Sequence, residues 1–190
     1  MNPGTFHLIV LALIVILPLA YILGTYNRLV KLRFTIRESW SNVDTELKRR
    51  YDLIPNLVNT VKGYAAHERE TLEAVTRARQ TAVASTGSPA SQARDENELV
   101  RQMRSLFAVV ERYPDLKANQ NFLALQHELA NTEDRIQAAR RFYNGNVRAM
   151  NVLVQSVPSN IIAGMFGFKE EEYFEIEDLG MRLPVQVSLT

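Results

Sequence analysis

A single apolar run near the N-terminus constrains this chain more than any other feature of its sequence. Residues Phe6 to Leu23 read FHLIVLALIVILPLAYIL and contain no Asp, Glu, Lys or Arg. As an α-helix rising about 1.5 Å per residue, the run is roughly 27 Å long, close to the hydrocarbon thickness of a bilayer. The side chains predicted to form a membrane anchor are Phe6, Leu8, Leu11, Ile14, Leu17, Tyr21 and Leu23.

Two other interpretations of the run fit the sequence less well. A cleavable signal peptide carries a basic segment before its apolar core and a small-residue cleavage site, and the run has neither. A buried core helix has about 10–14 apolar residues and a polar stripe, whereas this run has no stripe. Pro18 is tolerated within a membrane helix. The sequence therefore predicts a single-pass anchor.

Positive charges follow the run and none precedes it. Arg28, Lys31, Arg33 and Arg37 lie on its C-terminal side. Because flanking cations tend to remain cytoplasmic, the N-terminus is predicted outside a bacterial inner membrane and residues 28–190 inside it. The predicted regions are an external N-terminus (1–5), a transmembrane helix (6–26), a helical bundle (27–157) and an aromatic and acidic tail (158–190).

The rest of the chain has helical periodicity. One apolar stripe continues from Leu29 to Tyr51, so the first helix is predicted to run from the membrane to about Arg50. Asp52 then caps a second helix from Leu53 to Ala84, with Pro55 in its first turn. The alternative is one continuous helix through Pro55, which by this reasoning leaves the tail far from the membrane.

Two further helices follow. Gly87 is predicted to end the second helix. Ser88 and Pro89 then predict the start of a third helix, which reaches Glu111. A fourth helix extends from about Phe122 to Val154, with Gly145 either inside it or forming a turn. The fold class is therefore all-α: the transmembrane helix continues into an antiparallel up-and-down four-helix bundle with an irregular C-terminal tail.

Motifs for chemistry are missing from the sequence. The chain has no cysteine, and neither His67 nor His127 has the glutamate spacing of a di-iron bundle. No nucleotide-binding loop, nucleophile elbow or zinc-protease motif is present. Basic residues are not interleaved with stacking aromatics, and the net charge is +1, so nucleic acid is not a predicted partner. We expect no catalytic, cofactor-binding or metal-binding residues.

Three motifs carry a resemblance to a known family. They are RRYDLIPNLV at 49–58 continuing to KGYAAHE at 62–68, YPDLKA at 113–118 with Asn121-Phe122 and Leu125-Gln126, and RRFYN at 140–144 followed by Asn151, Pro158, Asn160 and Gly167-Phe168. Together with the apolar run and Tyr26-Asn27, they resemble the LemA family of bacterial membrane proteins over nearly the whole chain. Gly145 and the acidic tail depart from the family pattern. The resemblance implies an N-terminal membrane helix, a four-helix bundle and no established enzymatic activity, and a magnetosome-associated branch suggests membrane organisation by analogy.

The C-terminal end raises two further expectations. Alternating helix directions return residues Ile161, Ile162, Met165, Phe166 and Phe168 to the membrane side, where they either enter the lipid interface or cap the end of the bundle core. The acidic tail ends in the alternating segment Val185–Leu189, and it is either disordered or adds to a neighbouring subunit.

The predicted function follows from these features. The chain is expected to be a membrane-anchored helical scaffold that contacts lipid, forms homo-oligomers and organises the membrane without catalysis. The alternative is a regulatory adaptor that binds an unidentified membrane enzyme.

Overall fold

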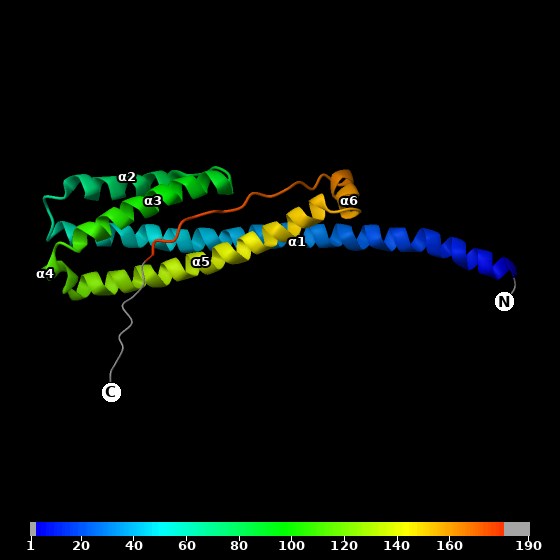
Figure 1. The fold of residues 1–190 in the computed structure, drawn as a ribbon, viewed down its shortest axis with the longest axis horizontal. Coiled ribbons are helices and arrows are strands. Elements are labelled where there is room, and N and C mark those ends of the chain that lie inside the picture. Colours follow the sequence, from blue (N-terminus) through cyan, green and yellow to red (C-terminus); the bar gives the residue numbers. More distant parts are fainter. Residues whose placement is uncertain (1–2, 181–190) are drawn as a thin grey trace, which may run out of the picture. The chain divides into compact units, whose positions relative to one another are not determined.

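The computed structural model describes residues 3–180, except for the side chains at positions 3, 5, 6, 8 and 9. The described part is all-helical and contains no strand, as the sequence predicts. The helices follow one another along the chain (Figure 1) as α1 (Pro3–Lys62), α2 (Arg69–Ala84), α3 (Pro89–Val110), α4 (Pro114–Lys117), α5 (Gln120–Gln155) and α6 (Ser159–Met165).

The predicted break between Arg50 and Asp52 is wrong. Helix α1 continues without interruption through Pro55 to Lys62, which is the alternative that the sequence left open. The chain reverses over residues 63–68 instead, and α2 begins at Arg69. The chain still reverses once between α1 and α2, so successive helices alternate in direction as predicted. A continuous first helix therefore does not place the aromatic tail far from the N-terminal part of α1, as we had expected it to.

A side chain from another helix explains why α1 survives Pro55. Proline has no backbone N–H, so the carbonyl oxygen of Tyr51 loses the donor that residue 55 normally supplies. The Nε of Arg79 in α2 donates to this same oxygen at 2.6 Å. The hydrogen bond that Pro55 removes is therefore replaced from α2, and the backbone polar group remains satisfied.

The predicted start of α3 is confirmed. The Ser88 hydroxyl accepts from the backbone N–H of Ser91 at 3.4 Å, and Pro89 occupies the first turn. Gly87 has a different role from the predicted one, because α2 ends at Ala84 with Ser85 as its C-cap. A Cβ at Gly87 would lie 2.9 Å from the Cβ of Ser91, so glycine is needed here for close approach.

Helix α5 confirms the prediction of one long helix across Gly145. It extends from Gln120 to Gln155, and the alternative turn at Gly145 is wrong. A cis peptide bond at Val157-Pro158 precedes α6. The short helix α4 follows Tyr113, which is its N-cap, and lies between α3 and α5 in the chain.

The chain divides into two compact units. Of the described residues, the first contains 3–38 and 145–171, and the second contains 39–144 and 172–180. Both α1 and α5 contribute to each unit, because the division falls within these helices.

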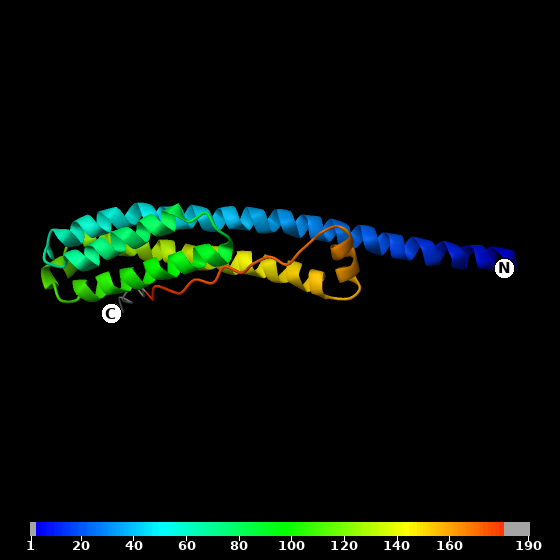
Figure 2. The same cartoon turned by 90° about the horizontal axis from the view of Figure 1, so that it is seen from above.

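In the second unit, segments of α1, α2, α3 and α5 lie alongside one another (Figures 1 and 2). Their apolar stripes meet in a core whose most buried members include Val43, Leu47, Ile54, Leu57, Val75, Leu99, Met103, Leu106, Leu129 and Ile136. Most of the stripe positions expected from the sequence are therefore buried, including those of α1 on both sides of Pro55.

A charged cluster lies within this apolar core. Arg50 of α1 is fully buried and forms ion pairs with Glu96 of α3 and Glu133 of α5, the latter at 3.0 Å. The hydroxyl of Tyr51 also donates to Glu96. We call Arg50, Tyr51, Glu96 and Glu133 the buried arginine cluster.

The surroundings of this cluster shift the pKa values of its members. Burial alone would lower the pKa of Arg50, but its attraction to Glu133 and Glu96 outweighs that effect and raises the pKa. Burial raises the pKa of the Tyr51 hydroxyl, and the Glu96 carboxylate adds to the effect. Arg50 therefore remains a cation and Tyr51 a protonated donor across the ordinary pH range.

In the first unit, the end of α5 and helix α6 pack against the N-terminal half of α1. Leu29, Val147 and Ile162 are buried there. The ring of Tyr26 lies 4.7 Å from that of Phe166 and 6.1 Å from that of Phe168, measured between centroids. The chain after α5 therefore returns to the part of α1 that directly follows the apolar run.

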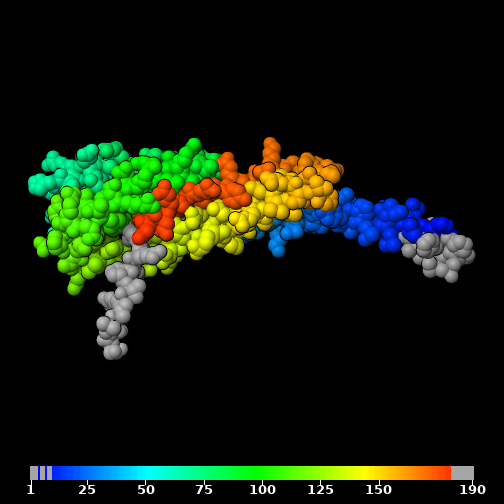
Figure 3. All heavy atoms as spheres, in the orientation of Figure 1, coloured from blue at the N-terminus to red at the C-terminus, as the bar shows by residue number. Residues whose placement is uncertain are grey.

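The sequence left open whether the acidic tail is disordered or adds to a neighbouring subunit, and residues 169–180 of this tail have a defined path in the structure. In the second unit, residues 172–179 form an extended segment, which we call the C-terminal strap, along α3 and α5 (Figure 3). Phe174, Ile176 and Leu179 are buried at 0%, 4% and 5% exposure. Trp40 packs against Phe174 with centroids 5.2 Å apart. The predicted alternating segment Val185–Leu189 lies outside the described residues.

We expect Arg79→Met to lower the free energy of unfolding by about 1–3 kcal/mol, because it leaves the Tyr51 carbonyl without a donor. The loss should shrink when Pro55→Ala is also present, since an alanine at this position supplies its own N–H to that carbonyl. Urea unfolding of the full chain in detergent, followed by circular dichroism, measures both. Arg77→Met, at an exposed arginine on the same helix, is the matched control. Equal losses from Arg79→Met with and without Pro55 would contradict this role of Arg79.

Adjacent arginines test the buried arginine cluster. Arg50→Leu leaves two carboxylates buried without their cation, and we expect it to destabilise the chain by about 3–5 kcal/mol. Arg49 pairs with Glu128 at 3.3 Å where both side chains are about half exposed, 46% and 49%. Arg49→Leu should therefore change the free energy of unfolding by less than about 1 kcal/mol. Similar effects from the two substitutions in the same urea titration would show that the cluster does not stabilise the fold.

Candidate functional site

The apolar run forms the N-terminal part of α1 and leaves its side chains uncovered. Only 6% of the most apolar 18-residue stretch of the helix is buried. Among the described helices, α1 is the one long and apolar enough to cross a membrane. Leu11, Ile14, Leu17, Tyr21 and Leu23 are all exposed, whereas the side chains of Phe6 and Leu8 lie outside the described ones. An exposed apolar surface of this extent requires lipid or another apolar surface to cover it.

The structure divides the predicted C-terminal contact residues into two groups. Ile162 and Phe168 are buried, at 4% and 7% exposure, and they close the apolar interior of the first unit. Ile161, Met165 and Phe166 are exposed at 60%, 70% and 48%. Helix α6 therefore has one apolar side packed inward and a second apolar side open.

Sequence reasoning did not include one further exposed apolar residue next to α6. Val157 directly precedes Pro158 and is 80% exposed. Its place outside the helical stripe gave no periodic signal, although an apolar residue in a turn between two helices could have indicated it. We call Val157, Ile161, Met165 and Phe166 the α6 apolar patch.

Cations and aromatic rings lie near the α6 apolar patch within the first unit. The guanidinium of Arg33 lies 4.9 Å from the centroid of the Phe168 ring, and Tyr26 stacks at a tilt on Phe166. Arg28 and Lys31 belong to the same part of α1. Aromatic rings beside exposed apolar and cationic side chains are the composition found at a membrane–water interface.

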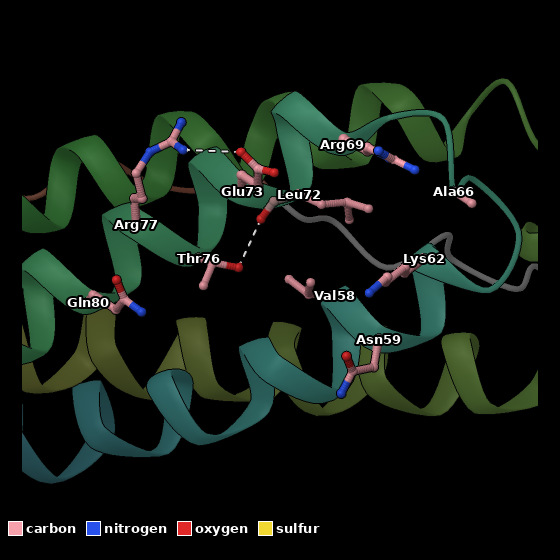
Figure 4. A pocket seen from close by; sticks show the side chains of 10 residues that line it. All are labelled: Val58, Asn59, Lys62, Ala66, Arg69, Leu72, Glu73, Thr76, Arg77 and Gln80. Atoms are coloured by element: carbon pink, nitrogen blue, oxygen red, sulfur yellow. Dashed lines mark hydrogen bonds and ion pairs between the residues drawn. The ribbon is translucent and has the colours of Figure 1, made fainter.

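A separate groove lies in the second unit between the end of α1 and α2 (Figure 4). It has a volume of ≈ 760 Å³ and is lined by Val58, Asn59, Lys62, Ala66, Arg69, Leu72, Glu73, Thr76, Arg77 and Gln80. Arg77 is paired with Glu73 at 3.4 Å. Apolar side chains with Lys62 and Arg69 beside them can bind an acidic and apolar surface.

The acidic residues of the described part do not form a metal centre. Within residues 3–180, no group of three or more His, Asp or Glu side chains is placed to hold a metal ion. The buried carboxylates of Glu96 and Glu133 are both paired with Arg50. Burial raises the pKa of Glu133 above its ordinary value, although Arg50 opposes that shift.

Comparison with known proteins gives a family match and several relatives. A family model described as the LemA family matches residues 39–189. "Magnetosome protein MamQ 2" of Paramagnetospirillum magneticum is 26% identical over 200 residues, which cover 91% of this chain and 73% of the relative. "Magnetosome protein MamQ" of Magnetospirillum gryphiswaldense is 26% identical over 186 residues, covering 84% and 68%. "Protein LemA" of Metamycoplasma hominis is 25% identical over 156 residues, covering 82% and 71%.

Proposed function

This chain belongs to the LemA family, and we propose that it is a membrane-anchored helical scaffold that self-associates and organises the membrane without catalysis. In this proposal α1 spans a bacterial inner membrane once, with the N-terminus outside. The second unit is an antiparallel up-and-down four-helix bundle in the cytoplasm.

The observation that carries this proposal is the unbroken helix α1. Its N-terminal part exposes Leu11, Ile14 and Leu17, and its C-terminal part buries Leu47, Ile54 and Leu57. One helix therefore carries both a surface that needs lipid and a surface that needs protein. The magnetosome relatives support membrane organisation by analogy alone.

The α6 apolar patch supports a second contact with the same membrane. It contacts Tyr26, which lies three positions beyond Leu23 at the end of the apolar run. Exposed apolar side chains at this level enter the lipid interface, while the cations of α1 interact with anionic headgroups. Ile162 and Phe168 fix α6 in place by packing into the first unit.

Tryptophan fluorescence tests this second contact. Trp40 is the single native tryptophan, so Phe166→Trp is placed in a Trp40→Phe chain and reconstituted in nanodiscs. We expect blue-shifted emission and quenching by brominated lipid. Phe142→Trp, at an exposed site in the second unit, is the matched control and should show neither effect. A Phe166→Trp signal equal to that of the control would contradict an interfacial α6.

Assembly in lipid tests the scaffold itself. We expect purified full-length protein, reconstituted without any partner, to form homo-oligomers that electron microscopy resolves on the membrane. A scaffold needs only copies of itself, whereas a regulatory adaptor remains small until its target enzyme is added. Protein that stays monomeric at high density in lipid would contradict the scaffold and favour the adaptor.

A further inference from the structure

The C-terminal strap is held mainly through its backbone. Asn144 of α5 donates from Nδ2 to the carbonyl oxygen of Phe174 and accepts at Oδ1 from the N–H of the same residue, both at 2.9 Å. Asn97 of α3 donates to the carbonyl of Glu175 at 3.1 Å and accepts from the N–H of Glu177 at 2.7 Å. Each amide therefore replaces the neighbouring strand that an extended chain would otherwise pair with.

Further side chains of α3 and α5 complete this recognition. The Tyr143 hydroxyl donates to the carbonyl of Glu172 at 2.9 Å, and Nη1 of Arg140 donates to that of Ile176 at 2.6 Å. Arg104 donates to the carbonyl of Asp178. The backbone contacts run almost the full length of the strap, and they come from side chains that project from two helices.

Apolar and acidic side chains of the strap add selectivity. Phe174, Ile176 and Leu179 are buried, which defines an apolar pattern at positions 1, 3 and 6 of a six-residue segment. The carboxylate of Glu177 pairs with Arg104 at 2.7 Å. The surface thus accepts an extended segment with this apolar spacing and acidic residues between. It is built as a receptor for a peptide, as in other proteins that recognise an extended chain.

We propose that the surface of α3 and α5 that binds the strap, which we call the strap groove, also takes residues 172–179 of a second copy, so that straps exchanged between copies link them into the assembly. The inference rests on the proposed anchoring and self-association. A second copy supplies the same backbone and the same three anchors, so exchange loses no contact within the strap groove. Only the connection of the strap to its own chain changes.

Three features favour exchange. Gly167, just before the strap, has φ +70°, a conformation that glycine adopts without strain and that redirects the chain after α6. Lys169 and Glu170 are exposed and can take a different path, whereas Phe168 before them is buried and the backbone of Glu171 after them is bound by Asn151. The exchange therefore pivots on these two residues. Chains anchored in one membrane also meet at a high effective concentration, which compensates for the loss of the intramolecular connection.

Single cysteines in differently tagged chains test the exchange, because the native chain has none. One chain carries Arg104→Cys and the other carries Glu177→Cys, which replace an exposed ion pair between the strap groove and the strap. They are co-expressed at full length and treated in the membrane with a short bis-maleimide. We expect a cross-linked dimer with both tags, at least about tenfold above the yield from Arg77→Cys mixed with Glu177→Cys.

A chain that carries both Arg104→Cys and Glu177→Cys completes the test, since only it can react internally when the strap stays on its own chain. An internal link without any mixed dimer would overturn the exchange. Absence of both products would overturn the placement of the strap itself. Electron microscopy of the same uncross-linked samples separates this outcome from the proposed function: homo-oligomers without mixed dimers would leave the scaffold intact and refute only the exchange.

Discussion

One turn of α1 makes polar contacts with every other long helix of the second unit. Arg50 forms ion pairs with Glu96 in α3 and Glu133 in α5. The backbone carbonyl of Tyr51 accepts a hydrogen bond from the guanidinium of Arg79 in α2. We expect these contacts to select the rotation of α1 about its axis, because any other rotation leaves a buried cation or carboxylate unpaired. The same turn also keeps the helix continuous beyond Pro55. Contacts at two consecutive residues of α1 thus connect the packing of the second unit with the continuation of α1, and Arg79 supplies one of them.

The local features of the fold could be predicted from the sequence. The apolar run, the cap at Ser88 and the long helix through Gly145 each depend on residues close together in the chain, where helix periodicity and capping rules apply. The continuation of α1 could not be predicted in this way. Pro55 and Asp52 gave a local signal for a break, and the donor that overrides it comes from Arg79, 28 residues beyond Tyr51. A tertiary hydrogen bond prevailed over local propensity.

The candidate site could be predicted from the sequence only in part, because local patterns are readable there and tertiary contacts are not. The aromatic residues after Pro158 indicated a special segment, but which of them pack inward depends on the contact of Phe166 and Phe168 with Tyr26. The ordered strap was missed because its acidic composition is typical of a disordered tail. Its partners, Asn97 and Asn144, look like ordinary polar helix positions until the extended chain lies against them. Recognition of backbone by side-chain amides leaves no periodic pattern in a sequence.

The described features that can bind other molecules are surfaces. The N-terminal part of α1 presents apolar side chains that need lipid or another apolar surface to cover them, and α6 presents a smaller apolar patch near cations and aromatic rings. Side chains of α3 and α5 bind an extended chain. In the second unit, the buried charges of Arg50, Glu96 and Glu133 are paired with one another. We therefore expect a protein that holds membranes and copies of itself together.

Every proposed role of this chain requires that α1 crosses the membrane and leaves the helical units on the inner side. Cysteine accessibility tests this directly, with a membrane-impermeant maleimide on spheroplasts that express Gly4→Cys, Leu17→Cys or Asp44→Cys in an otherwise cysteine-free chain. We expect Gly4→Cys to be labelled in intact spheroplasts, Asp44→Cys only after disruption, and Leu17→Cys only after detergent dissolves the membrane. Labelling of Leu17→Cys before detergent would refute the span, and labelling of Asp44→Cys in intact spheroplasts would refute the orientation.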